Sequence, residues 1–438
     1  MAVVRLSGST DPPFADGAGR GNAMNRIHPK RVCLVTPGHV ASNPRLVKEA
    51  NALCEAGYHV RVVAGDYMPV IRPLDQALLR TVQWEWQPVT YGALLGDRCR
   101  AAWQKGLRYV ARYCPLPVPW AAWSHHRLWR RLADAAAAQP ADIYLGHNLA
   151  ALPAAARAAT QHRAQLGFDA EDFHTGELPE TPEHQWEIQL RDRIERAFLP
   201  QCQHFTAAAP GIAAAYQQRY GVTADVILNV FPRSEASALA DSSMPTESSL
   251  PRSLYWFSQT IGQGRGLEPV VRALGTMRTT VNLYLRGHLA NGYGDYLKGL
   301  AEDCGVAEQI HLLPPAPAGD MVPLAAPYSL GLSLEETQTP NRSLCLTNKI
   351  FTYLLAGLPV LLSRTAAQAT LATELGAAAF LVDLEQGEIA TQLDALFAAP
   401  QQLFQSRQVA WQLGHTRFNW DVEKQRFLAS ISQALENH

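Results

Sequence analysis

The sequence predicts an α/β protein built from two doubly wound, Rossmann-like domains with parallel sheets. The chain has 438 residues, which is more than one ordinary domain contains. Short continuous apolar runs alternate with segments whose apolar residues recur at helical spacing, the pattern of buried parallel strands and their covering helices. A stretch rich in Ser, Pro and Ala at residues 233–252 separates two such series and is predicted to be an interdomain linker.

The composition is that of a globular protein and argues against several classes of function. Apolar residues make up 47% and charged residues 18%, and the net charge of −1 gives no overall attraction to nucleic acid. The seven cysteines show neither a disulfide framework nor the spacing of a zinc site. No apolar run reaches the ~20 residues that span a bilayer. We therefore expect a cytoplasmic protein with reduced cysteines that binds no metal and no nucleic acid.

The first series, residues 31–232, opens with a βαβ unit. An apolar run ends at a Pro-Gly turn, and a helix follows with Pro44 in its first turn and Gly57 suited to its C-terminal cap. The next strand begins at His59. Later strands are predicted at 142–147, 165–169, 204–208 and 225–229. The tight loops imply right-handed crossovers and a parallel sheet with ligands at its carboxyl ends.

The second series, residues 253–415, repeats this architecture without a short sequence repeat. Its strands are predicted at 253–258, 281–286, 310–313, 330–334, 359–363 and 379–382. Residues 416–438 are interpreted as a C-terminal helix that can cross back to the first domain. Residues 1–30, rich in Gly, Asp, Pro and Ala, are predicted to be a disordered extension.

Residues 98–131 interrupt the first series with a different kind of segment. They contain eight Lys or Arg, no Asp or Glu, and Trp103, Trp120, Trp123 and Trp129. Basic residues interleaved with Trp suit peripheral contact with the inner face of a membrane, where each cation near anionic lipid contributes ~1 kcal/mol. The alternative is a solvated helical hairpin whose Trp side chains pack on the sheet.

The most informative stretch runs from Glu335 to Leu362. Here a strand leads through a polar loop into a helix that starts near Asn348 and stops at Gly357. The N-terminus of such a helix presents free N–H groups and the positive end of its dipole, which suit a diphosphate. Lys349 adds a positive charge in the same place. The alternative is an amphipathic helix with an ordinary Asn cap.

The helix Asn348-Lys-Ile-Phe-Thr-Tyr-Leu-Leu-Ala-Gly-Leu-Pro-Val resembles the donor-site helix of GT-B glycosyltransferases of the family 4 type. Further segments resemble that family in the same order, namely Thr36 to Gly57, His147-Asn-Leu-Ala-Ala-Leu-Pro-Ala, Phe168-Asp-Ala-Glu-Asp and Gly211 to Pro232. In succession they cover nearly all of residues 31–430. The resemblance implies the GT-B architecture, in which two Rossmann-like domains face each other across a cleft.

The resemblance also implies a retaining transfer, with a nucleotide-sugar donor on the C-terminal domain and the acceptor on the N-terminal domain. The site must stabilise a departing nucleoside diphosphate. Because the sequence has no Asp-x-Asp metal motif, we expect cations and backbone amides to do so without a cofactor. The best cations are Arg265, Arg286 and Lys349, since they can bind phosphate. The other predicted donor-binding residues are Gly262, Gly264, Gly266, Asn341, Ser343, Leu344, Asn348 and Thr352.

The candidate catalytic residues, His147 and Asp169, each end a predicted strand. With an unperturbed pKa of about 6.5, His147 can act as a general base or hydrogen-bond a sugar. A structural histidine and solvated loop carboxylates are the alternatives. The predicted acceptor-binding residues are Asn43, Arg45, Asn148, Glu171 and Asp172.

The sequence departs from the family pattern at the donor and acceptor sites. Leu344 and Thr352 stand where family members carry two donor-binding Glu residues, and Asn148 and Glu171 replace Asp and His. Three hypotheses therefore stay open. The first is an active transferase that uses a saccharide or lipid-linked acceptor in surface polysaccharide or glycolipid assembly. The second is a weak or inactive relative that serves as a binding subunit or scaffold, and the third is a nucleotide-sugar epimerase.

Overall fold

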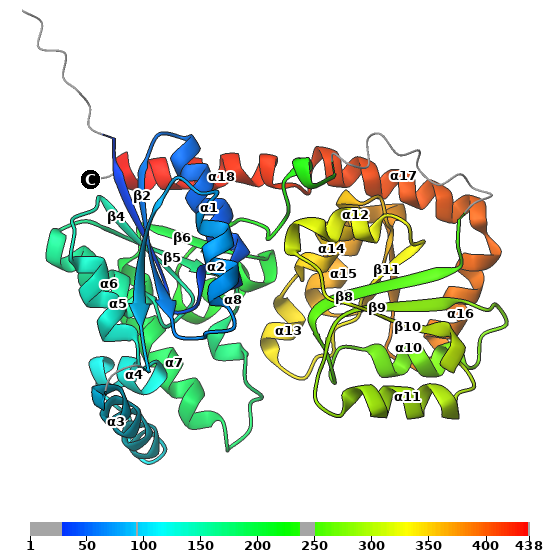
Figure 1. The fold of residues 1–438 in the computed structure, drawn as a ribbon, viewed down its shortest axis with the longest axis horizontal. Helices are drawn as coiled ribbons and strands as arrows, with labels where there is room; N and C mark the ends of the chain where they lie inside the picture. Colours follow the sequence, from blue (N-terminus) through cyan, green and yellow to red (C-terminus); the bar gives the residue numbers. More distant parts are fainter. Residues whose placement is uncertain (1–28, 93–94, 237–249, 437–438) are drawn as a thin grey trace, which may run out of the picture.

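The structure is a computed structural model that describes residues 29–92, 95–236 and 250–436. Two parallel sheets lie side by side, each in its own domain with helices packed around it (Figure 1). This confirms the predicted fold class. The predicted extension lies outside the described residues up to position 28, and so does most of the predicted linker, residues 237–249.

The N-terminal domain contains seven parallel strands in the order β3-β2-β1-β4-β5-β6-β7. Central strands are buried apolar runs, and Val32 of β1 lies between Val60 of β2 and Ile143 of β4. The strands are β1 (Arg31–Thr36), β2 (His59–Asp66), β3 (Glu85–Thr90), β4 (Ile143–His147), β5 (Gln165–Ala170), β6 (His204–Ala207) and β7 (Asp225–Val226).

Eight helices of the N-terminal domain connect these strands. On one face of the sheet α5 packs beside α6, and on the other α1 lies beside the C-terminal helix (Figure 1). The helices are α1 (Pro44–Glu55), α2 (Arg72–Leu79), α3 (Leu95–Ala111), α4 (Val118–His125), α5 (Trp129–Ala137), α6 (Leu152–His162), α7 (Gln185–Phe198) and α8 (Pro210–Tyr220).

Both edge strands of this sheet differ from the sequence-based expectation. Strand β7 stops at Val226 rather than at residue 229, because the Ile227 carbonyl accepts a hydrogen bond of 2.6 Å from Arg45 Nη1 instead of a ladder bond. Strand β3 was not predicted. It contains Pro88, which cannot donate to a ladder and suits only an edge position.

The C-terminal domain contains six parallel strands in the order β10-β9-β8-β11-β12-β13. The strands are β8 (Ser253–Ile261), β9 (Asn282–Leu289), β10 (Ile310–Leu313), β11 (Leu330–Ser333), β12 (Val360–Ser363) and β13 (Ala379–Val382). The helices of this domain are α10 (Leu267–Leu274), α11 (Tyr293–Asp303), α12 (Met321–Ala325), α13 (Pro340–Leu344), α14 (Asn348–Leu355), α15 (Ala366–Leu375), α16 (Gln386–Ala398) and α17 (Pro400–Thr416). The C-terminal helix α18 (Trp420–Glu436) follows them.

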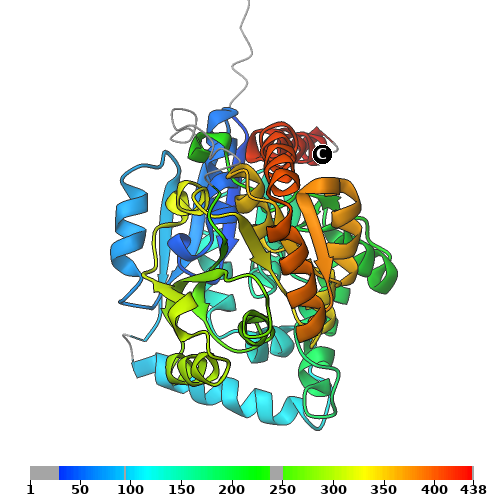
Figure 2. The same cartoon turned by 90° about the vertical axis from the view of Figure 1, so that its right-hand side faces the viewer.

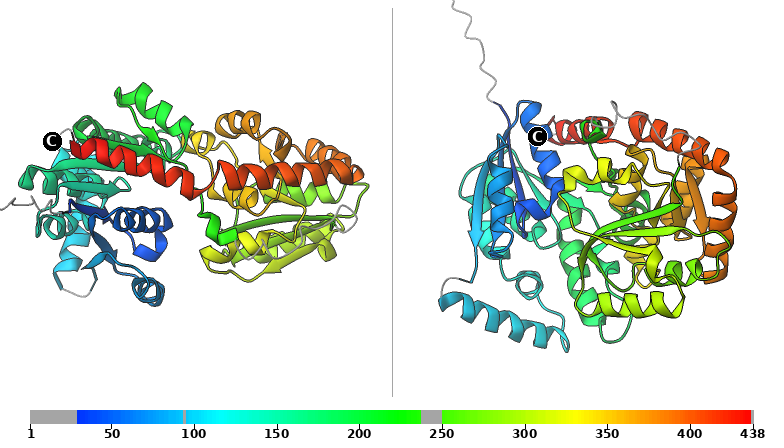
Figure 3. Two further views of the ribbon diagram at one scale, coloured as in Figure 1. Left: turned by 90° about the horizontal axis from the view of Figure 1, so that it is seen from above. Right: turned by 45° about the vertical axis from the view of Figure 1, so that its right-hand side comes forward.

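Helices α17 and α18 run along one side of both domains (Figure 3). Helix α17 packs so closely on α14 that a Cβ at Gly414 would lie 2.6 Å from the Leu354 carbonyl carbon. Helix α18 then packs on the N-terminal domain, where the Ser430 hydroxyl donates to Asp225 at 2.6 Å. The segment that leaves the first domain near Phe231 and the segment that returns to it near Trp420 lie side by side, since Trp420 N donates to the Phe231 carbonyl at 2.8 Å.

Among the described helices, none combines the length and apolar character that crossing a bilayer requires.

Candidate functional site

Each sheet has one point where the strand order reverses, and ligands of such sheets bind outside the carboxyl ends of the strands there. In the N-terminal domain this point lies between β1 and β4, and in the C-terminal domain between β8 and β11. The loop after β8 contains residues 262–266, and the loop after β11 leads into α13 and α14. The sequence-predicted donor residues therefore lie at the second reversal point.

Two cations lie beside one buried carboxylate at this point, and a third, Arg265, acts on one of them. Lys349 Nζ lies 3.6 Å from Glu335 Oε1, and Arg342 Nη1 lies 3.8 Å from Glu335 Oε2. Burial lowers the pKa of Lys349, Glu335 raises it, and the charge of Arg265 lowers it again. The guanidinium of Arg265 has no hydrogen bond or ion pair within the described part of the chain. This group, the basic cluster, consists of Arg265, Arg342 and Lys349 and carries more positive charge than Glu335 neutralises.

The glycine loop after β8 brings its backbone close to the basic cluster. Gly264 and Gly266 both have positive φ, 70° and 67°, which few other residues adopt. A Cβ at Gly266 would lie 2.7 Å from the Leu334 carbonyl oxygen, so the loop can only pack against β11 with glycine there. Arg342 Nη1 donates to the Gly264 carbonyl at 2.5 Å and ties α13 to the loop.

Helix α14 begins beside the basic cluster with uncapped amides. The helix begins at Asn348, where its start was predicted, its N-cap is Thr347 rather than the Asn of the alternative interpretation, and no side chain caps its first turn. The Thr347 hydroxyl instead lies 3.0 Å from the Ser333 hydroxyl. Free N–H groups and the positive end of the helix dipole therefore add to the field of the basic cluster.

Several predicted donor residues have other partners. Arg286 donates to the Tyr255 hydroxyl at 2.9 Å and to the Pro314 carbonyl at 2.8 Å, so its guanidinium is already engaged. Thr352 is fully buried and donates to the Asn348 carbonyl at 3.2 Å within its own helix. Thr352 therefore offers no hydroxyl to a ribose in this structure. Ser343 is half-buried, Asn348 is exposed and Gly262 is buried.

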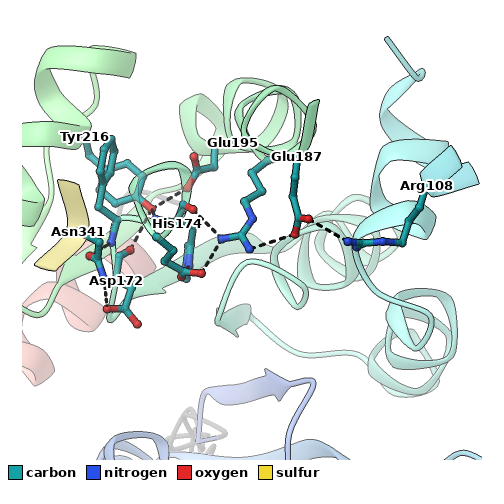
Figure 4. A network of polar contacts seen from close by, with 10 residues as sticks. Arg108, Asp172, His174, Glu187, Glu195, Tyr216 and Asn341 are labelled. Atoms are coloured by element: carbon teal, nitrogen blue, oxygen red, sulfur yellow. Dashed lines mark hydrogen bonds and ion pairs between the residues drawn. The ribbon is translucent and has the colours of Figure 1, made fainter. Parts of the chain in front are cut away.

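Asn341 and Leu344 contact the N-terminal domain rather than the donor loop. Asn341 Nδ2 donates to Asp172 Oδ1 at 2.7 Å, and Asn341 Oδ1 accepts from the Phe173 amide at 2.8 Å. A Cβ on Gly211, at the start of α8, would lie 2.9 Å from the Leu344 carbonyl oxygen. The segment α13 is thus held between the domains (Figure 4), and the predicted acceptor residue Asp172 serves as its anchor.

A sealed charge cluster occupies the N-terminal reversal point. Arg45 forms a fork with Asp169, with Nε and Nη2 at 2.8 and 2.7 Å from the two carboxylate oxygens. His147 lies between two carboxylates, with Nε2 3.2 Å from Glu49 and Nδ1 3.4 Å from Asp169. The Thr206 hydroxyl also donates to Asp169, at 2.6 Å. Arg45, Glu49, His147 and Asp169 are at most 1% exposed.

The expectation that His147 and Asp169 touch the substrate does not fit this geometry. Burial lowers the pKa of His147, but Glu49 and Asp169 raise it to a net value of about 10, so the imidazole is charged at neutral pH. Burial raises the pKa of Asp169, and Arg45 and His147 outweigh it and lower that pKa. A histidine that keeps its proton at neutral pH is a poor general base.

Two predicted acceptor residues do face outward near the reversal point. Asn148 follows β4 and is exposed, with a φ of 72° that Asn tolerates better than most residues. Glu171 follows β5 and is partly exposed, with Asn229 Nδ2 3.4 Å from its carboxylate. Burial and the charge of Asp169 raise the pKa of Glu171 to about 7. Asn43 instead caps α1, accepting from the Leu46 amide at 3.0 Å.

Sequence reasoning missed three charged residues of these clusters. Glu335 and Arg342 complete the donor side, and Glu49 completes the buried cluster. Glu49 had a signal, because it stands four residues after Arg45 on one helix face, 3.4 Å from its Nε. Arg342 had none, since its partner is the Gly264 carbonyl, 78 residues away in sequence.

No family model and no curated protein sequence matches the chain, but solved structures do. HepE of Anabaena, crystallised with UDP and glucose, matches with a TM-score of 0.64 and 18% identity, over 92% of this chain and 99% of that one. Sucrose-phosphate synthase of Thermosynechococcus elongatus matches at 0.68 and 12%, over 93% and 100%. WaaG, a glycosyltransferase involved in lipopolysaccharide biosynthesis, matches at 0.51 and 14%, over 91% and 98%. The chain therefore has the GT-B fold that the sequence predicts, along nearly its whole length.

Proposed function

We propose that the protein is a glycosyltransferase that moves a sugar from a nucleotide-sugar donor to a hydroxyl group of a saccharide or lipid-linked acceptor. In this reaction the bond between the anomeric carbon and the donor's diphosphate breaks, and a bond forms between that carbon and the acceptor oxygen. The nucleoside diphosphate leaves, and the acceptor hydroxyl loses its proton. HepE, whose fold this chain shares, was crystallised with UDP-glucose, a donor of this class.

The observation that supports this proposal most strongly is the basic cluster at the β8/β11 reversal point. The three cations of this cluster exceed the single carboxylate of Glu335 in charge, and repulsion from Arg265 lowers the pKa of Lys349. A donor diphosphate bound between these cations relieves the repulsion. The negative charge of the diphosphate grows as its bond to the sugar breaks. Preorganised cations and helix amides in a partly dry site therefore stabilise the leaving group more than the bound donor.

Two finer features belong to the proposal and rest on the sequence alone. Retention of the anomeric configuration is implied by the family resemblance, and it is tested by the proton coupling constant of the product's anomeric signal. Metal independence rests on the absence of an Asp-x-Asp motif from the sequence. Activity that survives exhaustive chelation supports it, and activity restored only by a divalent cation contradicts it.

We place the acceptor at the carboxyl edge of β4 and β5, where Asn148 and Glu171 face outward. His147 and Asp169 then act as positioning residues, because their buried cluster fixes the end of β5 two residues before Glu171. Glu171 accepts a hydrogen bond from the acceptor hydroxyl when it is ionised. Two departures of this chain from the family pattern, Asn148 and Glu171, thus become parts of its acceptor site.

Glu171 gives the acceptor step a pH dependence that can be measured. Because its pKa is raised to about 7, the acceptor KM is expected to fall as the pH rises through about 7, and Glu171→Gln removes this inflection. Because the pKa of Glu171 is higher in the folded than in the unfolded state, its protonated carboxyl also contributes to the stability of the fold. This contribution is fully present below the unfolded pKa and is lost as the pH rises through about 7. The exposed Glu180→Gln serves as control. An inflection that persists in Glu171→Gln contradicts the assignment.

A thermal-shift panel of UDP-, GDP-, ADP-, CMP- and dTDP-sugars tests the function itself. A ligand present at 100 times its Kd stabilises a protein by ~2.7 kcal/mol, which shifts the melting temperature measurably. One donor is expected to stabilise the protein, and the same donor is expected to release its nucleotide when an acceptor is added. Stabilisation by none of them favours a scaffold protein. Interconversion of the sugar without release of nucleotide favours an epimerase.

A further inference from the structure

Helix α3 presents its apolar face outward. At ~100° per residue the exposed residues Ala102, Trp103, Gly106, Tyr109, Val110 and Tyr113 fall on one arc of about 120°, with Tyr113 just past the helix end. Trp103 is 53% exposed, Tyr109 62% and Tyr113 72%. Trp120 of α4 is 49% exposed and lies edge-on to Trp103, with ring centroids 6.4 Å apart. This surface, the α3 face, consists of these seven residues.

Large exposed apolar side chains gather near the α3 face rather than scattering over the protein. In the described ranges eleven large apolar residues are exposed, and five of them are Trp103, Tyr109, Val110, Tyr113 and Trp120. Isolated exposed apolar residues are ordinary, whereas a contiguous patch marks a binding surface. Packing on the rest of the domain does not account for this apolar patch, because the opposite side of α3 is the side that faces the domain.

Cations line one side of the α3 face. Arg98, Lys105 and Arg112 recur every seven residues and are exposed. Arg98 and Lys105 have no carboxylate partner in the described part of the chain, and Arg112 lies 5.5 Å from the Trp186 ring. Three of the other five cations of residues 98–131 pair with carboxylates, as when Arg131 Nη2 lies 2.6 Å from Asp97. Arg98 and Lys105 thus leave unpaired positive charge beside the apolar arc.

Helix α3 is fastened to the domain by few apolar contacts. Leu107 is its one fully buried large apolar side chain among those described, and Gln104 Nε2 donates to the Ser124 carbonyl at 3.2 Å. Trp123 and Trp129, by contrast, pack on each other inside, with centroids 6.1 Å apart. The two interpretations of residues 98–131, contact with a membrane and packing on the sheet, therefore apply to different Trp residues. Trp123 and Trp129 pack inward, and Trp103 and Trp120 face out.

The position of α3 relates it to the acceptor side. It follows β3, so it extends from the carboxyl edge of the N-terminal sheet, on the side of the molecule opposite α18 (Figures 1 and 2). A chain of polar contacts runs inward from it (Figure 4). Arg108 donates to Glu187 at 2.9 Å, Arg191 bridges Glu187 and Glu177, and Glu177 accepts from His174 at 2.7 Å.

The same contacts continue to the interdomain segment. The amide of His174 donates to the Tyr216 hydroxyl at 3.4 Å, and that hydroxyl donates to the Asp172 carbonyl at 3.2 Å. Asp172 in turn accepts from Asn341 of α13 at 2.7 Å. A surface that contacts α3 is therefore held in a fixed position relative to the segment between the two domains.

From this arrangement we propose that the α3 face binds the surface of an anionic lipid bilayer. The aromatic arc enters the headgroup region, where amphipathic rings are favoured, and Arg98, Lys105 and Arg112 contact lipid phosphates beside it. The occupant is a bilayer rather than a protein because exposed cations that lack a carboxylate partner in the described part of the chain flank the apolar arc along its length. This inference rests on the proposed function for its purpose, since it brings the acceptor edge to a lipid-linked acceptor at the inner face of a membrane.

Co-sedimentation of the full-length protein with vesicles tests this proposal. Binding is expected to vesicles of phosphatidylcholine mixed with phosphatidylglycerol, to be much weaker to phosphatidylcholine alone, and to decline in high salt. Replacement of the three cations by Gln is expected to weaken binding about fivefold per charge, or roughly a hundredfold in all. Replacement of Trp103, Tyr109 and Tyr113 by Ser is expected to cost about tenfold per ring.

A matched control removes three exposed cations from the C-terminal domain, Arg278, Lys298 and Arg364, and is expected to bind as the wild type does. Equal loss of binding in this control overturns the proposal, because general charge would then explain the attraction. Equal binding to both kinds of vesicle, binding to neither, or binding unchanged by salt also overturns it. So does a dimer, seen by sedimentation equilibrium, that the Ser variants dissociate.

These outcomes are separate from those of the proposed function. Each α3 variant is also tested for stabilisation by the donor panel, which requires no membrane. Variants that keep the donor-induced shift but lose vesicle binding support both proposals. Wild-type protein that binds vesicles but no donor contradicts only the transferase, and wild-type protein that binds a donor but no vesicles contradicts only the membrane surface.

Discussion

Replacing Asp169 with Ala is expected to lower the free energy of unfolding by about 3–5 kcal/mol, the largest effect of any single substitution we predict. The carboxylate accepts two bonds from Arg45 and one from Thr206, and it lies beside the charged ring of His147. Its loss leaves two cations in a dry interior with only Glu49 to balance them. Urea-induced unfolding followed by circular dichroism measures the change.

The control for this prediction removes both charges of the fork. The double variant Arg45→Met with Asp169→Leu leaves no unpaired guanidinium and is expected to recover part of the lost stability. An exposed ion pair, Arg157 with Asp134, provides the comparison, because Asp134→Ala is expected to change stability by less than about 1 kcal/mol. Equal effects of Asp169→Ala and Asp134→Ala would contradict the sealed cluster.

Replacing Lys349 with Met is expected to weaken donor binding about 10- to 100-fold, since a hydrogen bond to a charged group contributes about 1.5–3 kcal/mol. Met keeps an unbranched apolar side chain at this position, where the Lys349 ammonium lies 5.6 Å from the centroid of the Trp256 ring. The substitution removes the one cation that α14 adds to the basic cluster. Isothermal titration with the donor identified by the thermal-shift panel measures the loss.

Two variants control this experiment. Lys298→Met removes an exposed cation of α11 and is expected to leave the affinity unchanged. Arg265→Met is expected to weaken binding to a similar extent as Lys349→Met, since its guanidinium has no other partner in the described chain. Unchanged affinity in both Lys349→Met and Arg265→Met would place the diphosphate elsewhere.

Most of the fold could be predicted because its central strands are short buried apolar runs and its helix ends carry Pro and Gly. The predicted start of the first helix at Pro44 and its stop before Gly57 follow from local preferences, as does the turn at Gly357. Prediction was weaker at the edges of the N-terminal sheet. Strand β3, which is half-exposed and carries Pro88, was missed, and β7 was predicted three residues too long, because the Ile227 carbonyl bonds to the side chain of Arg45.

The site was predictable in position but not in the partners of its residues. Parallel topology alone places His147, Asp169 and Lys349 at carboxyl edges of strands. Whether a charged side chain faces a substrate or another charge depends on residues far away in sequence. Asp169 meets Arg45, 124 residues away, and Asn341 meets Asp172, 169 residues away. Neither pairing leaves a periodic signal in the chain.

The affinity of the wild-type protein for a nucleoside diphosphate, compared with that for the matching nucleoside, tests the central claim most directly. If the basic cluster binds a diphosphate, the nucleoside diphosphate of the stabilising donor binds at least about 100-fold more tightly than its nucleoside, because charge-assisted bonds to phosphate are the strong ones. The difference is expected to shrink in Lys349→Met. Equal affinity for diphosphate and nucleoside would contradict a phosphate site at Arg265, Arg342 and Lys349.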